Sequence, residues 1–332
     1  MKNIFISRLE NKFRTVYAEH FDALIARGNF DSHLYSRDEI VEKDLVFHDT
    51  ENIFSTWGMP RFTEEEIKHH FPALKAVYYA AGSVQNFARE FLTVGVRVHS
   101  AWAANAVPVV EFTVAEIVLA NKGVFAHMRE MKQRNLERCN ALKENYLGNY
   151  GEKVGLLGIG MIGSMVAERL KDYKLEVLAF DPFLSDERAE ELHVKKCSLD
   201  ELFSSCRVIS NHMANNEQTK GMLTYRHFSK MLPYATFLNT GRGAQVVEDD
   251  LVRALTERPD LCAILDVTEP EPSPEGHPFY ALPNCFLTPH IAGSLCNETH
   301  RMAQYMIEEY DKIENGISAK YEVTLKMLET MA

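Results

Sequence analysis

Three short polar stretches each follow a predicted strand in the second half of the chain. The stretch 239–243, Asn-Thr-Gly-Arg-Gly, places Arg242 between two glycines. The stretch 266–271 contains three acidic residues, and 288–290 places His290 directly after a proline. The planar fork of an arginine can bind a carboxylate through two hydrogen bonds. A histidine beside a carboxylate is oriented by it and is stabilised in its charged form, so such a pair can exchange a proton near neutral pH.

This combination fits the reduction of a 2-oxo acid. A cation must hold the acid group, a proton donor must reach the carbonyl oxygen, and a hydride donor must face the carbonyl carbon. Each residue also has a plainer interpretation. Arg242 could form a surface salt bridge, the acids could be solvated, and His290 could be structural.

A dinucleotide site is predicted at residues 152–181. An apolar run at 154–157 reads as a buried strand, three glycines follow at G-x-G-x-x-G spacing, and 164–171 is amphipathic. Gly158 would allow a tight turn, Gly160 a close approach of the backbone to a pyrophosphate, and Gly163 close packing of helix on strand. Asp181 ends the next apolar run, where a carboxylate should accept hydrogen bonds from the adenosine ribose. A glycine-rich turn in an ordinary α/β domain would not account for Asp181.

The first hundred residues alternate between predicted strands and helices, which favours a parallel sheet with covering helices. The strands are expected at 3–7, 45–48, 52–55, 76–80 and 97–99, and helices at 16–27 and 63–70. The loop 80–84 follows a strand, at the edge where such folds bind ligands. No glycine triplet opens a helix here, so this part is not expected to hold the cofactor.

The remainder is predicted to form one long helical region and a second α/β domain. The helical region covers 105–138 and a break follows at 147–151. Helices are then expected at 185–192, 199–204, 225–230, 248–257 and 297–314, and strands at 208–212, 235–239, 263–267 and 284–287. We therefore expect a cofactor domain at 104–291 with a doubly wound parallel sheet. A substrate domain would comprise 1–103 plus 292–332, with the active site in the cleft between the two.

Composition narrows the class of protein. With 332 residues, 46% hydrophobic and 25% charged, the chain is long enough for two globular domains. Its net charge of −11 argues against a nucleic-acid partner. No apolar stretch is expected to reach the roughly 18 residues that span a bilayer, so no membrane partner is predicted. The six cysteines form no C-x-x-C pair, which predicts reduced thiols in a cytoplasmic protein. His69 and His70 are expected at a solvated helix end, and no metal is predicted.

The motifs together resemble the D-isomer-specific 2-hydroxyacid dehydrogenases, which include phosphoglycerate, hydroxypyruvate/glyoxylate, D-lactate and formate dehydrogenases. The resemblance covers roughly residues 76–295. It rests on the glycine triplet with Asp181, on Asn-Thr-Gly-Arg-Gly, on Asp-Val-x-x-x-Glu-Pro and on Pro-His-Ile-Ala-Gly. It implies an α/β fold of two Rossmann-like domains, of which the substrate domain is flavodoxin-like, and NAD as cofactor.

The resemblance also implies roles for single residues. The family's catalytic arginine, glutamate and histidine correspond to Arg242, Glu271 and His290. Asp266 would hold the nicotinamide carboxamide. The remaining predicted contacts are Met161, Ile162, Met213 and Thr240 for the cofactor, and the loop Gly82, Ser83 and Val84 with Arg242 for the substrate.

Two departures from the family pattern are visible. The substrate loop has Ser83, Gln85 and Asn86 where a second glycine and an aspartate are usual, which affects substrate size and polarity. The loop after the strand at 208–212 has Ala214 and Asn215 in place of the usual Pro-Leu, which affects the fit of the cofactor.

The sequence thus predicts an oxidoreductase that interconverts a small 2-oxo acid and a (2R)-2-hydroxy acid. NAD(H) is expected over NADP(H), because Asp181 would repel a 2′-phosphate and residues 182–184 offer no arginine to receive one. A homodimer is expected from the resemblance and the long helix that begins near Asn105. The alternative is an NAD(H)-sensing binding protein, like the corepressors that share this fold and can retain the same residues.

Overall fold

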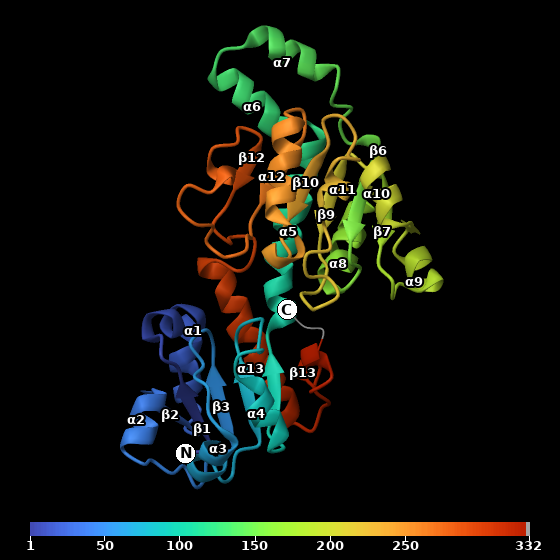
Figure 1. Ribbon diagram of the computed structural model, residues 1–332. Helices are drawn as coiled ribbons and strands as arrows, with labels where there is room; N and C mark the ends of the chain where they lie inside the picture. The colour runs from blue at the N-terminus through green and yellow to red at the C-terminus, as the bar shows by residue number, and fades with distance from the viewer. Residues whose placement is uncertain (330–332) are drawn as a thin grey trace. The chain divides into compact units, whose positions relative to one another are not determined.

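The computed structural model describes residues 1–329 and contains two compact units (Figure 1). Unit 1 comprises Met1–Ala106 and Ser294–Ala332, and unit 2 comprises Val107–Gly293. The chain leaves unit 1 inside one helix, α5 (Trp102–Asn121), and re-enters it after Gly293. The assignment of substrate to one unit and cofactor to the other stays a prediction.

Unit 1 is built on a six-stranded sheet of order β13-β5-β4-β3-β1-β2. The strands are β1 (Asn3–Ile6), β2 (Phe30–Tyr35), β3 (Asn52–Ser55), β4 (Ala76–Tyr79), β5 (Arg97–Ser100) and β13 (Glu322–Val323). The first five are parallel, in the flavodoxin-like order, and β13 is antiparallel to β5. The expected flavodoxin-like fold of this part is confirmed.

The helices of unit 1 cover this sheet. They are α1 (Glu10–Ile25), α2 (Arg37–Glu42), α3 (Glu64–His70), α4 (Ala88–Thr93) and α13 (His300–Glu314). Helix α13 packs against α1 and against β4 and β5, so a segment from the end of the chain lies beside its beginning (Figure 1). Met302, Met306 and Tyr310 of α13 are part of the unit 1 core.

One predicted strand of unit 1 was wrong, and two strands, β2 and β13, were not predicted. Residues 45–48 form no strand, and Phe47 instead stacks on Phe71 with ring centroids 5.5 Å apart. The actual strand is β2, which lies at the sheet edge, with Phe30 its one fully buried residue. An edge strand with so few buried residues does not show the apolar pattern by which a strand is recognised in sequence.

Unit 2 contains a seven-stranded parallel sheet of order β12-β11-β10-β9-β6-β7-β8. The strands are β6 (Tyr150–Leu157), β7 (Lys174–Phe180), β8 (Val194–Lys196), β9 (Val208–Asn211), β10 (Thr236–Asn239), β11 (Cys262–Leu265) and β12 (Cys285–Leu287). Chain order reverses between β6 and β9, as in a doubly wound dinucleotide fold. Successive strand residues such as Leu156 and Leu157 enter different apolar clusters, one on each face. The predicted doubly wound sheet is confirmed.

Three separate helices replace the single helical region expected at 105–138. They are α5, α6 (Val124–Lys132) and α7 (Leu136–Lys143). The first break is at Gly123, whose φ of 64° is left-handed and whose hypothetical Cβ would lie 2.4 Å from the Tyr146 ring. The second break contains Arg134, with φ of 54°. The remaining helices are α8 (Met161–Leu170), α9 (Asp186–Glu191), α10 (Leu199–Ser205), α11 (Tyr225–Phe228) and α12 (Glu248–Glu257).

Helix α5 corrects a second expectation. Its 20 residues are long and apolar enough to cross a membrane by length and composition, which the sequence analysis had excluded. Within the fold, 44% of its most apolar window is buried, and Val110, Ile117 and Ala120 belong to the core of unit 2. That face of α5 is therefore already covered by protein, as in the core helix of a globular domain.

Candidate active site

The glycine loop between β6 and α8 has the shape that a dinucleotide needs. Gly158 has φ of +85°, and its hypothetical Cβ would lie 2.8 Å from the Met213 Cα. A Cβ on Gly163 would lie 2.0 Å from the Gly158 carbonyl oxygen, so this helix starts in backbone contact with the turn. Nothing lies within 4 Å of the Cβ position of Gly160. The open side of the loop is thus at the residue expected to face a pyrophosphate.

The first turn of α8 offers unpaired donors to an anion. Helix α8 begins at Met161, and its N-cap, Gly160, has no side chain to occupy the free N–H groups. The N–H groups of Met161, Ile162 and Gly163 have no acceptor within the helix, and the helix dipole makes this end positive. The loop therefore fits a phosphate-bearing cofactor.

Asp181, directly after β7, has a role that sequence reasoning missed. Its Oδ2 accepts a hydrogen bond from the Ile159 N–H at 2.7 Å, and its Oδ1 accepts one from the Phe183 N–H at 2.8 Å. The carboxylate thus holds the middle of the glycine loop. Its two oxygens have further lone pairs, so the predicted contact with a ribose is still possible.

Arg242 follows β10 and is half-buried. Its Nη1 donates to the Gly241 carbonyl at 2.7 Å, and within residues 1–329 it forms no ion pair. Burial lowers the pKa of the Arg242 guanidinium, and the negative charge of Glu271 opposes that shift. Arginine remains charged at any physiological pH. The described chain thus gives no support to the surface salt bridge that was the plainer interpretation.

His290 and Glu271 form a close pair. The Nδ1 of His290 lies 2.6 Å from Oε1 of Glu271, and the two side chains are 46% and 40% exposed. An ionised carboxylate can only accept, so Nδ1 carries the proton in this bond and Nε2 is left for another partner. His290 has φ of 54°, and its N–H donates to the carbonyls of Asp266 and Thr288 at 3.0 Å.

Asp266, directly after β11, is buried and holds the segment that carries His290. Its Oδ1 accepts from the Thr288 hydroxyl at 2.6 Å and from the Ile291 N–H at 2.7 Å. Its Oδ2 accepts from the Ala292 N–H at 2.9 Å. This positioning role was not foreseen. The predicted contact of Asp266 with a nicotinamide stays a prediction.

The other predicted cofactor residues of unit 2 follow neighbouring strands. Met213 is buried after β9, and Thr240 is buried after β10, with its hydroxyl 3.2 Å from that of Thr113. The carboxyl ends of parallel strands meet at one sheet edge. The predicted site residues of unit 2 are therefore brought to the same edge, next to the point where chain order reverses.

The predicted substrate loop lies in unit 1, after β4. The N–H groups of Gly82, Ser83 and Val84 donate to no backbone acceptor within the described chain. The loop is held instead through its carbonyls, because the Ser100 hydroxyl donates to Ala81 and Gly82 at 2.9 and 2.6 Å. Ser100 is the last residue of β5. Its place at the end of a buried strand was the signal in the sequence that could have identified this role.

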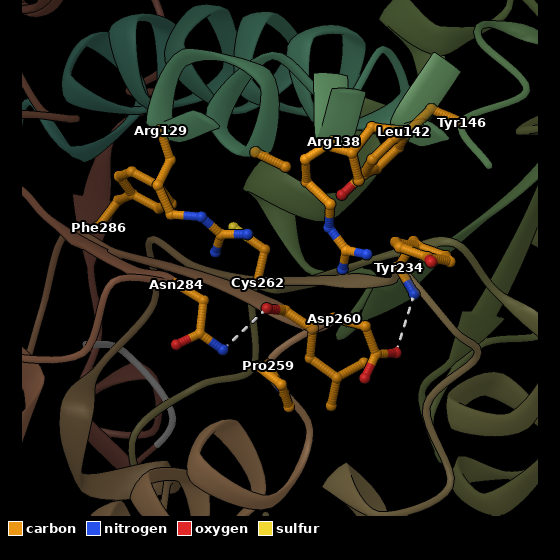
Figure 2. A pocket seen from close by; sticks show the side chains of 12 residues that line it. Arg129, Arg138, Leu142, Tyr146, Tyr234, Pro259, Asp260, Cys262, Asn284 and Phe286 are labelled. Carbon is orange, nitrogen blue, oxygen red and sulfur yellow. Dashed lines mark hydrogen bonds between the residues drawn. The ribbon is translucent and has the colours of Figure 1, made fainter. Parts of the chain in front are cut away.

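Two other groups of polar side chains lie away from this sheet edge. A cleft of about 10 Å³, enough for about one water, lies at the opposite edge of the unit 2 sheet, next to the starts of β11 and β12 (Figure 2). In unit 1, possible ligand atoms of Asp44, His69 and His70 lie within 4.8 Å of one another. His69 is exposed and pairs with Asp44, as expected of a solvated helix end, but His70 is buried and bonds to the Leu45 carbonyl.

Comparison with known proteins identifies unit 2. Residues 114–292 match the model of the D-isomer specific 2-hydroxyacid dehydrogenase NAD binding domain, so NAD is its cofactor. The D-3-phosphoglycerate dehydrogenase of Archaeoglobus fulgidus is 31% identical over 71% of this chain and 44% of its own length. That of Bacillus subtilis is 29% identical over 86% of this chain and 55% of its own. The chain therefore spans about half the length of these curated relatives.

Solved structures match nearly the whole length of the chain. The TT0316 protein from Thermus thermophilus superposes with a TM-score of 0.71 and 26% identity, covering 97% of this chain and 100% of that one. The apo form of Rhodotorula graminis D-mandelate dehydrogenase shares the fold, with a TM-score of 0.77 and 19% identity over 97% of each chain. With the motifs, the loop geometry and the matched NAD binding domain, the chain belongs to the D-isomer specific 2-hydroxyacid dehydrogenase family.

Proposed function

We propose that the chain is an NAD(H)-dependent oxidoreductase that interconverts a small 2-oxo acid and a (2R)-2-hydroxy acid. The observation that carries the proposal is the 2.6 Å contact between His290 Nδ1 and Glu271 Oε1. It lies at the sheet edge to which Arg242 and the glycine loop also belong. An acid/base pair, a cation and a dinucleotide loop at one edge are the groups that this reaction needs.

In this proposal each side chain has a distinct task. Arg242 binds the substrate carboxylate and polarises the carbonyl. When bound, NADH supplies the hydride that reduces the carbonyl carbon. His290 gives the proton on Nε2 to the carbonyl oxygen as negative charge develops there. Glu271 holds the ring through Nδ1 and stabilises its charged form, and in the oxidation direction the neutral ring takes the proton back.

We propose that the unit 1 loop 82–84 binds a carboxylate. Its three N–H groups have no backbone acceptor among residues 1–329, while Ser100 anchors the loop carbonyls. Groups of adjacent N–H donors of this kind bind anions. Ser83 is exposed, so its hydroxyl is available to a polar substrate.

We further propose that two copies of the chain associate and act in the cytoplasm. Helices α6 and α7 leave Met128, Met131 and Leu136 exposed, and apolar patches of this kind favour a protein partner. The six cysteines of the described chain are free thiols, which suits a reducing compartment. Sedimentation of the purified protein at several concentrations measures the assembly directly.

Turnover decides between an enzyme and an NAD(H) sensor. Purified protein is mixed with NADH and a panel of small 2-oxo acids, and NADH oxidation is followed by its absorbance. At least one acid should be reduced, and chiral chromatography should identify the product as the (2R)-2-hydroxy acid. NADH binding without oxidation by any acid would refute the proposal and favour the sensor.

A further inference from the structure

A buried network of three amide side chains lies beneath the loop that carries Arg242. Asn211 ends β9, Asn239 ends β10, and Gln245 ends the short 3-10 helix at Gly243–Gln245. Their exposed fractions are 0%, 1% and 0%. The Asn211 amide nitrogen donates to Asn239 Oδ1 at 3.0 Å and to Gln245 Oε1 at 2.5 Å. We call these three residues the amide network.

The amide network binds the Arg242 loop from one side. The Asn239 amide nitrogen donates to the Arg242 carbonyl at 3.1 Å, and its Oδ1 accepts from the Gly241 N–H at 3.1 Å. Gly241 lies directly on the network, because a Cβ there would be 3.1 Å from the Asn211 Nδ2. The backbone at Gly241 and Arg242 is therefore held by a side chain that is almost completely buried.

The same network binds the loop that follows β9. The Gln245 amide nitrogen donates to the carbonyls of Met213 and Ala214 at 2.7 and 2.9 Å. The Asn211 Oδ1 accepts from the Met213 N–H at 3.3 Å. Met213 is a predicted cofactor contact, and Ala214 occupies the place of the proline usual in the family. The amide network thus holds three backbone groups of this loop.

On its other side the Arg242 loop meets the segment that leads to Glu271. A Cβ on Gly243 would lie 2.1 Å from the Thr268 carbonyl carbon and 2.6 Å from the Glu269 nitrogen. The arginine is therefore flanked by two close backbone contacts, one against the network and one against the glutamate segment. The loop is closely packed on both sides, so a shift of the network would be transmitted to Arg242.

We propose that the amide network is a positioning device for Arg242, and that it couples the placement of the guanidinium to the Met213–Ala214 loop on the cofactor side. This inference rests on the proposed function. Its chemical basis is that every amide donor of Asn211 and Gln245 has an acceptor inside the network or the two loops. Buried amides satisfied in this way fix one geometry, since any slip leaves a donor unpaired.

A double-mutant cycle between the network and the arginine tests the proposal. Gln245→Leu removes both loop contacts with little change in volume, and Arg242→Lys removes the fork. We expect Gln245→Leu to lower kcat/KM for a 2-oxo acid by about 10- to 100-fold, the order of effect of an ångström-scale misplacement. In the Arg242→Lys background the same change should have little further effect, because the geometry it disturbs is no longer used.

Controls separate positioning from general damage. Thr219→Val removes the other hydrogen bond to the Ala214 carbonyl, which is 2.6 Å long and lies outside the network. It should change kcat/KM much less than Gln245→Leu does. NADH affinity from fluorescence titration and the thermal midpoint show whether each variant is folded. If Gln245→Leu does not fold, Asn211→Leu with Gln245→Leu replaces the polar pair by an apolar pair and takes its place in the cycle.

The outcomes are distinct. Additive effects in the cycle, or an unchanged kcat/KM in folded Gln245→Leu, would overturn the positioning role. Absence of turnover by the wild type would count against the proposed function instead. In that case the double-mutant cycle is measured with the affinity of oxamate, a 2-oxo acid analogue, for the NADH-loaded protein. Independent contributions of Gln245 and Arg242 to oxamate binding would overturn the inference in that case as well.

Discussion

At the scale of single residues, two carboxylates of the site are engaged before any ligand is considered. Asp181 holds the glycine loop through Ile159, and Asp266 holds the segment after β12 through Ile291 and Ala292. The sequence motifs predicted one role for each acid, a contact with the ribose for Asp181 and a contact with the nicotinamide for Asp266. Their second tasks depend on contacts between loops that are far apart in the chain, which local sequence patterns do not report.

Asp181 should determine both the preference between cofactors and the conformation of the glycine loop. Its charge disfavours a 2′-phosphate, so NADH should be used more efficiently than NADPH. Asp181→Ala should narrow this gap and also weaken NADH binding, because the Ile159 N–H loses its acceptor. Asp181→Asn keeps an acceptor for Ile159 and should change the preference with a smaller loss of NADH affinity. The measurement is kcat/KM and Kd for both cofactors, and equal use of the two by the wild type would contradict the prediction.

Glu271 and His290 should govern the dependence of the reaction on pH. Reduction needs the protonated ring and oxidation the neutral ring, so reduction falls and oxidation rises with increasing pH. Glu271→Gln removes the charge that stabilises the protonated ring, so both curves should move to lower pH. His290→Ala should lower the rate by about 10²–10⁴-fold, the usual range for a positioned acid/base.

Initial rates in both directions between pH 5 and 10 measure these curves. Glu269, in the same segment, gives the matched control, since its side chain forms no bond with His290 within the described chain. Glu269→Gln should leave the curves in place. If Glu271→Gln also leaves them in place, the 2.6 Å contact is not the one that matters in turnover.

At the scale of elements, regular periodicity was sufficient for most of the fold. Six of the seven strands of unit 2 were predicted, all but β8, as were the glycine loop and α12. The failures were β2, of whose six residues only Phe30 is buried, the short strands β8 and β13, and the breaks at Gly123 and Arg134 in a continuous helical pattern. The amide network was missed for a related reason. Asn211, Asn239 and Gln245 are ordinary polar residues in sequence, and only the parallel register of β9 and β10 brings them together.

Three glycines of one loop should respond differently to alanine. Gly160→Ala meets nothing within 4 Å, so the thermal midpoint should hardly change while NADH binding weakens, because the new methyl group occupies the predicted approach of the pyrophosphate. Gly163→Ala would meet the Gly158 carbonyl oxygen at 2.0 Å and should destabilise unit 2. Gly158→Ala combines a clash with a left-handed φ of +85° and should destabilise it too.

Thermal unfolding paired with NADH titration separates these cases. A Gly160→Ala protein that binds NADH as tightly as the wild type would remove this loop from the cofactor site. A Gly163→Ala protein of unchanged stability would show that helix α8 can move away from the turn.

At the scale of the whole molecule, His212 should link stability to pH. Its Nε2 lies 2.9 Å from the Ser210 hydroxyl, and its Nδ1 is buried without a partner in the described chain. Burial lowers the pKa of His212 to about 3. The unfolded chain takes up this proton near pH 6.5, so stability should fall as pH drops below that value, by at most about 1.4 kcal/mol per pH unit.

His212→Gln removes the titrating ring and should flatten the fall in stability between pH 7 and pH 5. Urea unfolding of both proteins at these two pH values gives the comparison. Equal slopes for the wild type and His212→Gln would show that the ring is already protonated, or already hydrated, in the folded chain.

The path of the chain through the two units has a consequence for biosynthesis. Residues 1–106 of unit 1 are made before unit 2, yet the core of unit 1 includes Met302 and Met306, and its sheet is completed by β13 at Glu322–Val323. Unit 2 is one uninterrupted segment, Val107–Gly293. During synthesis the inserted unit therefore has all its parts before the unit that began first. The nascent strands β1–β5 must wait, with their helix partner α13 still unmade, until the segment that follows unit 2 has left the ribosome.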